Sequence, residues 1–295
     1  MTSQGKLQSP RRQLLAALPL RERRLELAGI STAVLQGGEG PPVVLLHGPM
    51  GYAAHWMGVI PGLAQTHTVI APDLPGHGAS ETGDGALDAS RVLAWLGALI
   101  ERTCATPLVL VGQLLGGAIA LRFAIERGGL LQRLVLIDTF GLAPLQLAPA
   151  FGQALMQYQA EPGAATHEDL WRLCAFDLDR LRARMGGHWE SFEAYNVERA
   201  RAPATQAAMQ GLMQAFGFPA IAAQELERIE VSTSLVWGRH DMATPLAVAE
   251  AASRRHGWPL HVIEEANDDP PIEQPEAVLQ ALRAEMRRPE RVPSP

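Results

Sequence analysis

The chain has 295 residues, of which 47% are hydrophobic and 19% are charged, and its formal net charge at pH 7 is -6. This composition is typical of a globular protein with a large buried core, and it excludes disordered and fibrous classes. Lys and Arg do not cluster in excess outside the terminal segments, so we expect no nucleic-acid partner. No apolar run approaches the length of a membrane span, so we expect no membrane partner.

Cysteine is rare in this chain. Cys104 and Cys174 are too few for a disulfide framework and lack the close spacing of a metal or redox motif. We therefore expect a protein of the reducing cytoplasm that carries neither a metal nor a cofactor. The sequence does not predict an oligomeric state.

The predicted elements alternate along the chain. Residues 1–22 are interpreted as a frayed amphipathic leader, and the ranges 23–29 and 31–36 as a pair of antiparallel edge strands. Nearly continuous apolar runs, typical of parallel strands buried on both faces, follow at 43–47, 69–71, 108–111, 134–137, 235–237 and 260–263. Helical patterns at 87–102 and 117–127 lie between them. This alternation predicts a doubly wound, mostly parallel α/β sheet.

One long segment interrupts the alternation. About ninety residues separate two strands that a single helix would normally connect, and they show helical spacing at 170–185 and 205–216. We interpret residues 139–231 as a helical cap over a core that consists of 23–138 and 232–285. Residues 286–295, rich in Pro and Arg, are expected to form a loose tail.

Four motifs follow the predicted strands: His47-Gly48-Pro49-Met50-Gly51, the segment from Asp73 to Ser80, Gly112-Gln113-Leu114-Leu115-Gly116-Gly117, and Gly238-Arg239-His240-Asp241. In open α/β sheets, ligands bind at the carboxyl ends of the strands. In order and spacing these motifs resemble those of the α/β-hydrolase superfamily, from about Arg23 to Leu282. The resemblance implies an α/β-hydrolase fold with a helical cap.

The resemblance places the nucleophile of the family, usually a serine, at Leu114. A leucine side chain has no atom that can attack a carbonyl, so acyl-enzyme chemistry at this position is impossible. The flanking glycines still permit the sharp turn that this position requires. We therefore expect the turn to form and the Leu114 side chain to project into the pocket.

The resemblance also places the catalytic acid at Asp241. The pattern formed by Pro270, Glu273 and Pro275 places the catalytic histidine at Asp268, and a carboxylate lacks the two nitrogens that transfer a proton. One amide donor of the oxyanion hole aligns with Pro49, which has no N–H. Leu115 retains a donor, and Met50 can replace the lost one if the loop is shifted.

Two interpretations of the aspartates remain open. Asp241 and Asp268 can form a close pair near the pocket, in which repulsion raises one pKa and yields a general acid or base. Alternatively, backbone amides hold Asp241 while Asp268 and Asp269 point to solvent. Asp138, at the end of a strand, is expected to cap the next segment rather than to act as an acid.

Our first hypothesis is a protein that binds a small, largely apolar organic ligand without serine-hydrolase turnover. The residues expected to contact this ligand are Pro49, Met50, His55, Gln113, Leu114, Leu115 and Met242. Cap residues that can line the pocket or pack between helices are Trp171, Phe176, Trp189, Phe192, Tyr195, Met209 and Met213. A second hypothesis is a lyase, cyclase or decarboxylase that uses Asp241 or Asp268 in acid–base chemistry. A third is a surface interaction with a vestigial pocket.

Overall fold

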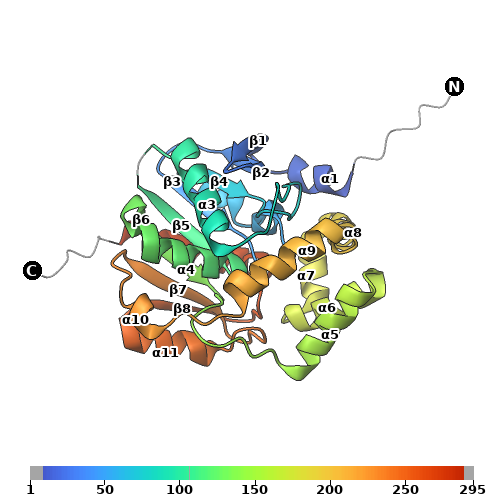
Figure 1. Cartoon of the computed structure of the whole chain (residues 1–295). Coiled ribbons are helices and arrows are strands. Elements are labelled where there is room, and N and C mark those ends of the chain that lie inside the picture. Colours follow the sequence, from blue (N-terminus) through green and yellow to red (C-terminus); the bar gives the residue numbers. More distant parts are fainter. Residues whose placement is uncertain (1–8, 106, 289–295) are drawn as a thin grey trace, which may run out of the picture.

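An eight-stranded sheet forms the centre of the computed structural model, which describes residues 9–105 and 107–288 (Figure 1). The strand order is β1-β2-β4-β3-β5-β6-β7-β8. β2 runs antiparallel to both β1 and β4, and the other neighbouring pairs are parallel. The predicted mostly parallel α/β sheet is therefore confirmed. The strands are β1 (Arg21–Leu27), β2 (Ile30–Gly37), β3 (Pro42–Leu46), β4 (Thr68–Pro72), β5 (Leu108–Gln113), β6 (Leu131–Ile137), β7 (Thr233–Gly238) and β8 (Leu260–Ile263).

Helices cover both faces of the sheet because its central strands are apolar on both sides. Val44 and Leu46 of β3 belong to one buried cluster, and Val43 and Leu45 belong to the other, as the alternation of side chains along a strand requires. The first cluster includes residues of α3 (Ala89–Thr103), α4 (Leu115–Arg127) and α11 (Leu246–His256). The second includes residues of α2 (Ile60–Leu63) and α13 (Pro275–Arg287). Shorter helices in the loops are η1 (Ala53–Trp56), η2 (Gly128–Leu130) and α12 (Pro270–Glu273).

A group of helices lies between β6 and β7, beside the carboxyl ends of the strands (Figure 1). The pattern at 170–185 gives two helices rather than one. The first ends at Cys174, and the Asp177 carboxylate then accepts a hydrogen bond from the Arg180 N–H (3.0 Å) and caps the second. These helices are α5 (Pro149–Ala160), α6 (Ala164–Cys174), α7 (Leu178–Met185), α8 (His188–Ala200), α9 (Pro203–Leu212), the π-helix η3 (Met213–Gly217) and α10 (Ala223–Leu226).

The predicted leader contains an ordered helix, α1 (Pro10–Ala16), which contacts α8. The prediction of a frayed leader is therefore wrong for this segment, because α1 buries Leu14 and forms a buried ion pair. Arg11 Nη2 lies 2.7 Å from Asp73 Oδ2, and its Nη1 donates a hydrogen bond to the Tyr195 hydroxyl of α8 (3.2 Å). The Asp73 side chain is fully buried and also accepts hydrogen bonds from the Ala53 and Ala79 N–H groups. Arg11 thus joins α1, a core loop and the cap.

The two ends of the chain are only partly described. Helix α13 continues to Arg287, so a loose tail beginning at Met286 is wrong for its first two residues. Arg288 follows the helix, and tail residues 289–295 and leader residues 1–8 lie outside the described residues. Across 9–105 and 107–288, no helix is both long and apolar enough to cross a membrane.

Candidate functional site

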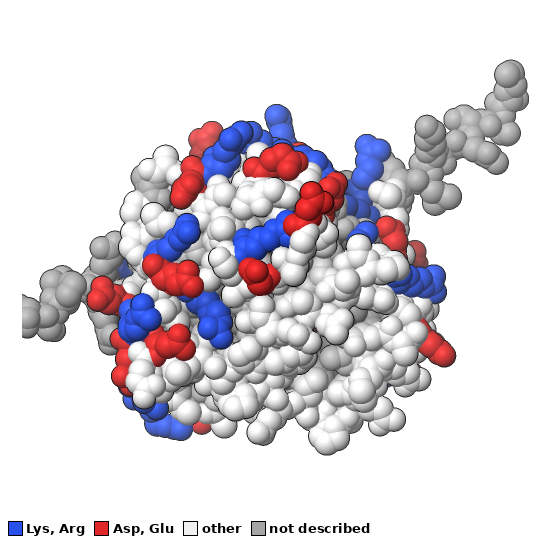
Figure 2. All heavy atoms as spheres, in the orientation of Figure 1, with Lys and Arg blue, Asp and Glu red and all other residues white. Residues whose placement is uncertain are grey.

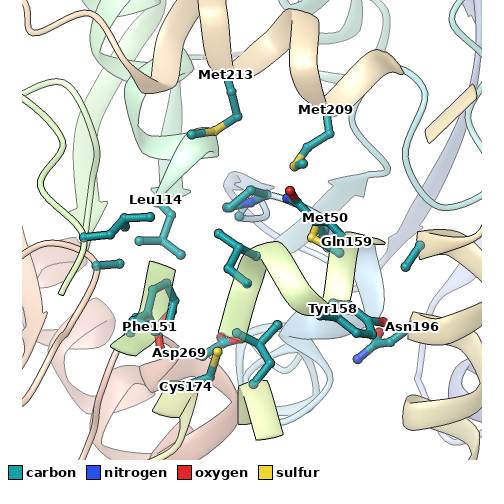
Figure 3. A pocket seen from close by; sticks show the side chains of 18 of the residues that line it. Met50, Leu114, Phe151, Tyr158, Gln159, Cys174, Asn196, Met209, Met213 and Asp269 are labelled. Carbon is teal, nitrogen blue, oxygen red and sulfur yellow. The ribbon is translucent and has the colours of Figure 1, made fainter. Parts of the chain in front are cut away.

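Leu114 occupies a sharp turn between β5 and α4. Its φ of 45° and ψ of -108° lie in a region that costs a non-glycine residue on the order of 1–3 kcal/mol. The Leu114 N–H donates to the Ile137 carbonyl (2.9 Å), and its carbonyl accepts from Ala118 and Phe140. A Cβ atom on Gly116 would lie 2.4 Å from the Leu46 carbonyl oxygen, so the glycine allows α4 to start against β3. The expected turn has therefore formed, with the Leu114 side chain at the cavity (Figure 3).

The loop that follows β3 faces this turn. Pro49 has no N–H to donate, and Met50 adopts a left-handed conformation with φ 57°. Both residues line the cavity beside Leu114. The Leu115 side chain is fully buried and does not line the cavity. Its backbone N–H stays a candidate donor, because the N–H groups in the first turn of a helix have no acceptor within that helix.

Buried carboxyl groups gather where β6 and β7 end. Asp241 Oδ1 accepts hydrogen bonds from the Ala243 and Thr244 N–H groups (2.7 Å each), and its Oδ2 accepts one from the Thr244 hydroxyl. Burial raises the pKa of Asp241 to about 6. Asp138 is not a helix cap, because its Oδ1 accepts from the Gly238 N–H (2.8 Å) and links the two strands. Burial and the Asp241 charge raise the pKa of Asp138 well above its usual range.

Asp268 lies in the loop after β8 and lines the cavity. Its exposed fraction is only 6%, and in the described part of the chain no group forms a hydrogen bond with its Oδ1. Asp269 is also buried, so the alternative in which both aspartates point to solvent is wrong. Burial, followed by the charges of Asp241 and Asp269, raises the pKa of Asp268 well above its usual range.

Gln113 holds the loop that carries these two aspartates. Its Nε2 donates to Asp269 Oδ1 (2.8 Å) and to the Asp268 carbonyl oxygen (3.2 Å). His55 Nδ1 lies 3.7 Å from Asp269 Oδ2, and the ring is enclosed by Tyr52 and Phe192. Gln113, His55 and Asp269 therefore form one polar wall of the cavity. Sequence reasoning did not assign Asp269 to the site, although its position next to Asp268 was the available signal.

Glu273 is a second buried carboxyl group that sequence reasoning missed as a functional residue. Its carboxylate accepts hydrogen bonds from the Asn267 N–H (2.8 Å) and the Phe176 N–H (2.6 Å), and so connects the β8 loop to the cap. Burial raises its pKa from 4.5 to about 7. The sequence signal that could have identified Glu273 was its place in the Pro-x-x-Glu-x-Pro pattern.

The raised pKa of Glu273 predicts a change of stability with pH. A carboxyl group whose pKa rises on folding binds its proton more tightly in the folded state, so its contribution is complete below pH 4.5 and is lost as the pH rises through about 7. Between pH 6 and 8, the free energy of unfolding of the native chain should fall by about 1 kcal/mol relative to Glu273→Gln.

Urea denaturation at several pH values measures this difference. Glu276→Gln, which removes an exposed carboxylate three residues away, is the matched control and should follow the native chain. Parallel curves for the native chain and Glu273→Gln would show that Glu273 does not titrate in this window.

The cavity lies between the sheet and the cap and has a volume of about 590 Å³. It is lined by six of the residues predicted for the site: Pro49, Met50, His55, Gln113, Leu114 and Asp268. Asp241 and Met242 do not line it. In the loop after β7 the lining residue is Ala243, because the Asp241 carboxylate turns back to bind the backbone of its own loop.

The cap provides most of the apolar surface of the cavity. Met209 and Met213 approach from α9 and η3, across from Leu114 and from Phe151 and Tyr158 of α5 (Figure 3). Of the aromatic residues proposed from the sequence, Trp171 lines the cavity, whereas Phe176, Trp189, Phe192 and Tyr195 do not. Sequence reasoning missed Phe151, Tyr158 and the polar groups Gln159, Asn196, Gln206 and Gln210, because helical spacing alone does not identify the face that meets the cavity.

Comparison with known proteins places this geometry in a family. The model of the "Alpha/beta hydrolase family" matches residues 43–281. The chain belongs to this family. The 2-hydroxy-6-oxo-6-phenylhexa-2,4-dienoate hydrolase of Comamonas testosteroni is 28% identical over 225 residues, which cover 72% of this chain and 75% of the relative. The soluble epoxide hydrolase of Corynebacterium sp. is 37% identical over 101 residues, which cover 34% of this chain.

The first curated relatives are matched over only part of their length. The chain spans 33% of the uncharacterized protein Rv2715 of Mycobacterium tuberculosis and 35% of the Corynebacterium epoxide hydrolase. Among solved structures, the 2-hydroxy-6-oxo-6-phenylhexa-2,4-dienoate hydrolase of Rhodococcus sp. strain RHA1 has a TM-score of 0.80 at 23% identity, covering 91% of this chain and 99% of that one. Carboxylesterase CesB of Bacillus subtilis has a TM-score of 0.79 at 20% identity, with coverages of 94% and 96%. At these identities the structural likeness establishes the fold alone.

Among the residues that the structure describes, no group of three or more His, Cys, Asp or Glu side chains is placed to hold a metal ion. Asp138, Asp241 and Asp268 approach one another closely enough to interact electrostatically, but hydrogen bonds from Gly238, Ala243 and Thr244 occupy oxygens of the first two. The arrangement is therefore a largely apolar cavity whose wall carries a carboxyl group, Asp268, with one oxygen that has no hydrogen-bond partner among the described residues.

Proposed function

We propose that this protein binds a small, largely apolar organic molecule in the cavity and does not carry out serine-hydrolase turnover. The observation that carries the proposal is the turn at Leu114, where an alkyl side chain reaches the cavity at the position that the family resemblance assigns to the nucleophile. Asp268 occupies the position at which the resemblance expects an imidazole.

The size and lining of the cavity support ligand binding. A volume of about 590 Å³ falls within the range of small-molecule pockets, which are mostly apolar and carry a few fixed polar groups. Gln113, Asn196 and Asp268 are such groups. Protein side chains do not fill the space, which argues against the hypothesis of a vestigial pocket.

The cavity contains another side chain that can act as a nucleophile, Cys174 of α6. A thiol attacks as its thiolate, and burial followed by the charges of Asp268 and Asp269 raises the pKa of Cys174 well above its usual range. The thiol is therefore protonated at neutral pH. It does not replace the missing serine.

The names of the relatives do not establish a substrate for this chain. The Comamonas relative is named for a dienoate, which is an anion with a phenyl ring. Over the described residues, the lining of this cavity contains Asp268 and Asp269 but no Lys or Arg. We therefore propose that the ligand of this chain resembles the apolar part of such a molecule and lacks its carboxylate.

Binding can be tested with N-phenyl-1-naphthylamine, an apolar probe whose fluorescence rises on leaving water. The native chain should enhance its fluorescence, and Met209→Trp should weaken the enhancement because the larger indole takes up part of the cavity. Met156→Trp, at a residue of α5 that is 67% exposed, is the matched control and should bind the probe like the native chain. Equal binding by both variants would place the probe elsewhere.

Turnover is tested separately with p-nitrophenyl esters. We expect the rate of ester hydrolysis with the native chain to equal the rate with Met209→Trp at the same protein concentration. A turnover that copurifies with the native chain and disappears in Met209→Trp would contradict the proposal.

One observation favours a second candidate, the acid–base enzyme. Asp268 lines the cavity, its Oδ1 is unpaired within the described ranges, and its raised pKa favours the protonated form, which can donate a proton to a bound molecule. Asp241 is not available in this way, since it does not line the cavity and its oxygens bind Ala243 and Thr244. The candidate therefore rests on Asp268 for a lyase, cyclase or decarboxylase reaction.

Any activity found in a substrate screen would be tested with Asp268→Asn, Asp241→Asn and the double variant. Loss in Asp268→Asn and retention in Asp241→Asn would support proton donation by Asp268. Full activity in the double variant would exclude a carboxylate mechanism.

A further inference from the structure

The carboxyl groups around the cavity differ in what binds them. Glu273 and Asp241 each accept hydrogen bonds from at least two backbone N–H groups, and Asp269 accepts one from Gln113. Asp268 Oδ1 is buried and, within 9–105 and 107–288, has no hydrogen-bond partner. A buried polar atom without a partner costs free energy, and because Asp268 lines the cavity, a ligand group that contacts its carboxyl group can offset that cost.

The charges that face Asp268 are predominantly negative. The charges of Asp241, Asp269 and Glu273 all act on it. In the described part of the chain, no Lys or Arg lines the cavity, and the two lining histidines do not pair with Asp268 Oδ1. Burial holds the pKa of His167 down at about 3, so this ring is neutral, and His55 lies beside Asp269. The local field therefore favours a cation and repels an anion.

The cavity that contains this acidic end also has apolar and aromatic lining groups. Cys174 lies close enough to Asp268 for the carboxylate charge to act on its thiol, and Trp171 lies one helical turn earlier on the same face of α6. Both residues line the cavity, as do Phe151 and Met213. Aromatic rings that line the same cavity as a carboxylate favour an ammonium group, because the face of a ring attracts cations.

We propose that the ligand is a protonated organic amine whose ammonium group binds the carboxylate of Asp268 and whose apolar body fills the cavity. The inference rests on the proposed function and adds the chemical class of the ligand. The ammonium group donates an N–H hydrogen bond to the Asp268 carboxylate, and any proton that the carboxyl group held is released to water, so the buried charge is paired.

Three probes of the same shape test this inference: 4-phenylbutylamine, 4-phenylbutan-1-ol and 4-phenylbutanoate. Isothermal titration calorimetry at neutral pH should give an affinity for the amine at least about tenfold above that for the alcohol, since a charge-assisted hydrogen bond is stronger than a neutral one. The carboxylate should bind most weakly.

A pair of variants locates the effect. Asp268→Asn keeps the shape of the side chain, and it should reduce the preference for the amine over the alcohol to less than about twofold. Glu264→Gln removes the same charge from an exposed residue that pairs with Arg239 at the surface, and it should keep the full preference.

The outcomes separate this inference from the function on which it rests. An alcohol that binds as tightly as the amine, or a carboxylate that binds more tightly than both, would overturn the amine ligand and leave the proposed cavity function standing. Failure of all three probes to bind would overturn both. A preference that survives in Asp268→Asn would also overturn the role of Asp268.

Discussion

The double variant Leu114→Ser/Asp268→His should hydrolyse p-nitrophenyl acetate at least about a hundredfold faster than Leu114→Ser alone, because a positioned general base contributes about 10²–10⁴ to such a step. The turn already has the backbone conformation of a strained residue between β5 and α4, so a serine placed there would reach the cavity. The single variant has the hydroxyl but no base to take its proton.

A histidine at position 268 would enter the cavity wall and lie close enough to Asp241 for their charges to interact, as Asp268 does now. Asp241 would then supply the acid that orients the imidazole. The rate should remain far below that of a full hydrolase if Met50 does not replace the amide donor that the family resemblance assigns to Pro49, because such a loss alone costs about 2.7–4 kcal/mol.

The matched control is Leu114→Ala/Asp268→His, which carries the histidine but no hydroxyl and should show only background hydrolysis. Burst kinetics and intact mass after mixing with the ester distinguish an acyl-enzyme from general hydrolysis. If Leu114→Ser alone equals the double variant, then a histidine at position 268 does not act as the base for a serine at position 114.

Replacing Arg11 with alanine should lower the free energy of unfolding by about 3 kcal/mol at pH 7.5, because removal of one partner leaves a buried charge uncompensated. The Asp73 side chain is fully buried, and after the change it keeps the Ala53 and Ala79 N–H groups as its partners among the residues that the structure describes. Burial raises the pKa of Asp73, and the Arg11 charge opposes this rise. The variant should therefore take up a proton at Asp73 more readily than the native chain.

Chemical denaturation monitored by tryptophan fluorescence measures the loss. Arg12→Ala, at the exposed neighbouring residue, is the matched control and should differ from the native chain by less than about 0.5 kcal/mol. At pH 5 the penalty of Arg11→Ala should shrink, since Asp73 can then be neutral. Equal stability of both variants at pH 7.5 would show that the ion pair does not hold α1 to the core.

Local patterns predicted most of the sheet and the turn at the candidate site. The apolar run around Val109 and the glycines on both sides of Leu114 depend on neighbours in sequence, so burial of the strand and the sharp turn followed from them. The placement of Asp268 followed from a family pattern rather than from local chemistry. Its burial did not follow from that pattern.

The features that sequence reasoning missed depend on residues far apart in the chain. Arg11 orders the N-terminal helix by reaching Asp73, and no local pattern contains that contact. Gln113 holds Asp269 from a strand on the opposite side of the insertion, and this contact turns the β8 loop inward. Within the cap, Asp177 could have been identified as a helix start, but the strong helical spacing around it hid the break.

The central claim is that no residue of the cavity becomes covalently acylated or phosphonylated, because Leu114 offers no nucleophile and the Cys174 thiol stays protonated. Intact mass spectrometry after incubation with a fluorophosphonate tests it most directly, with Leu114→Ser/Asp268→His as the positive control. We predict an unchanged mass for the native chain and a single adduct on Ser at position 114 in the control. A stoichiometric adduct on any cavity residue of the native chain would contradict the account.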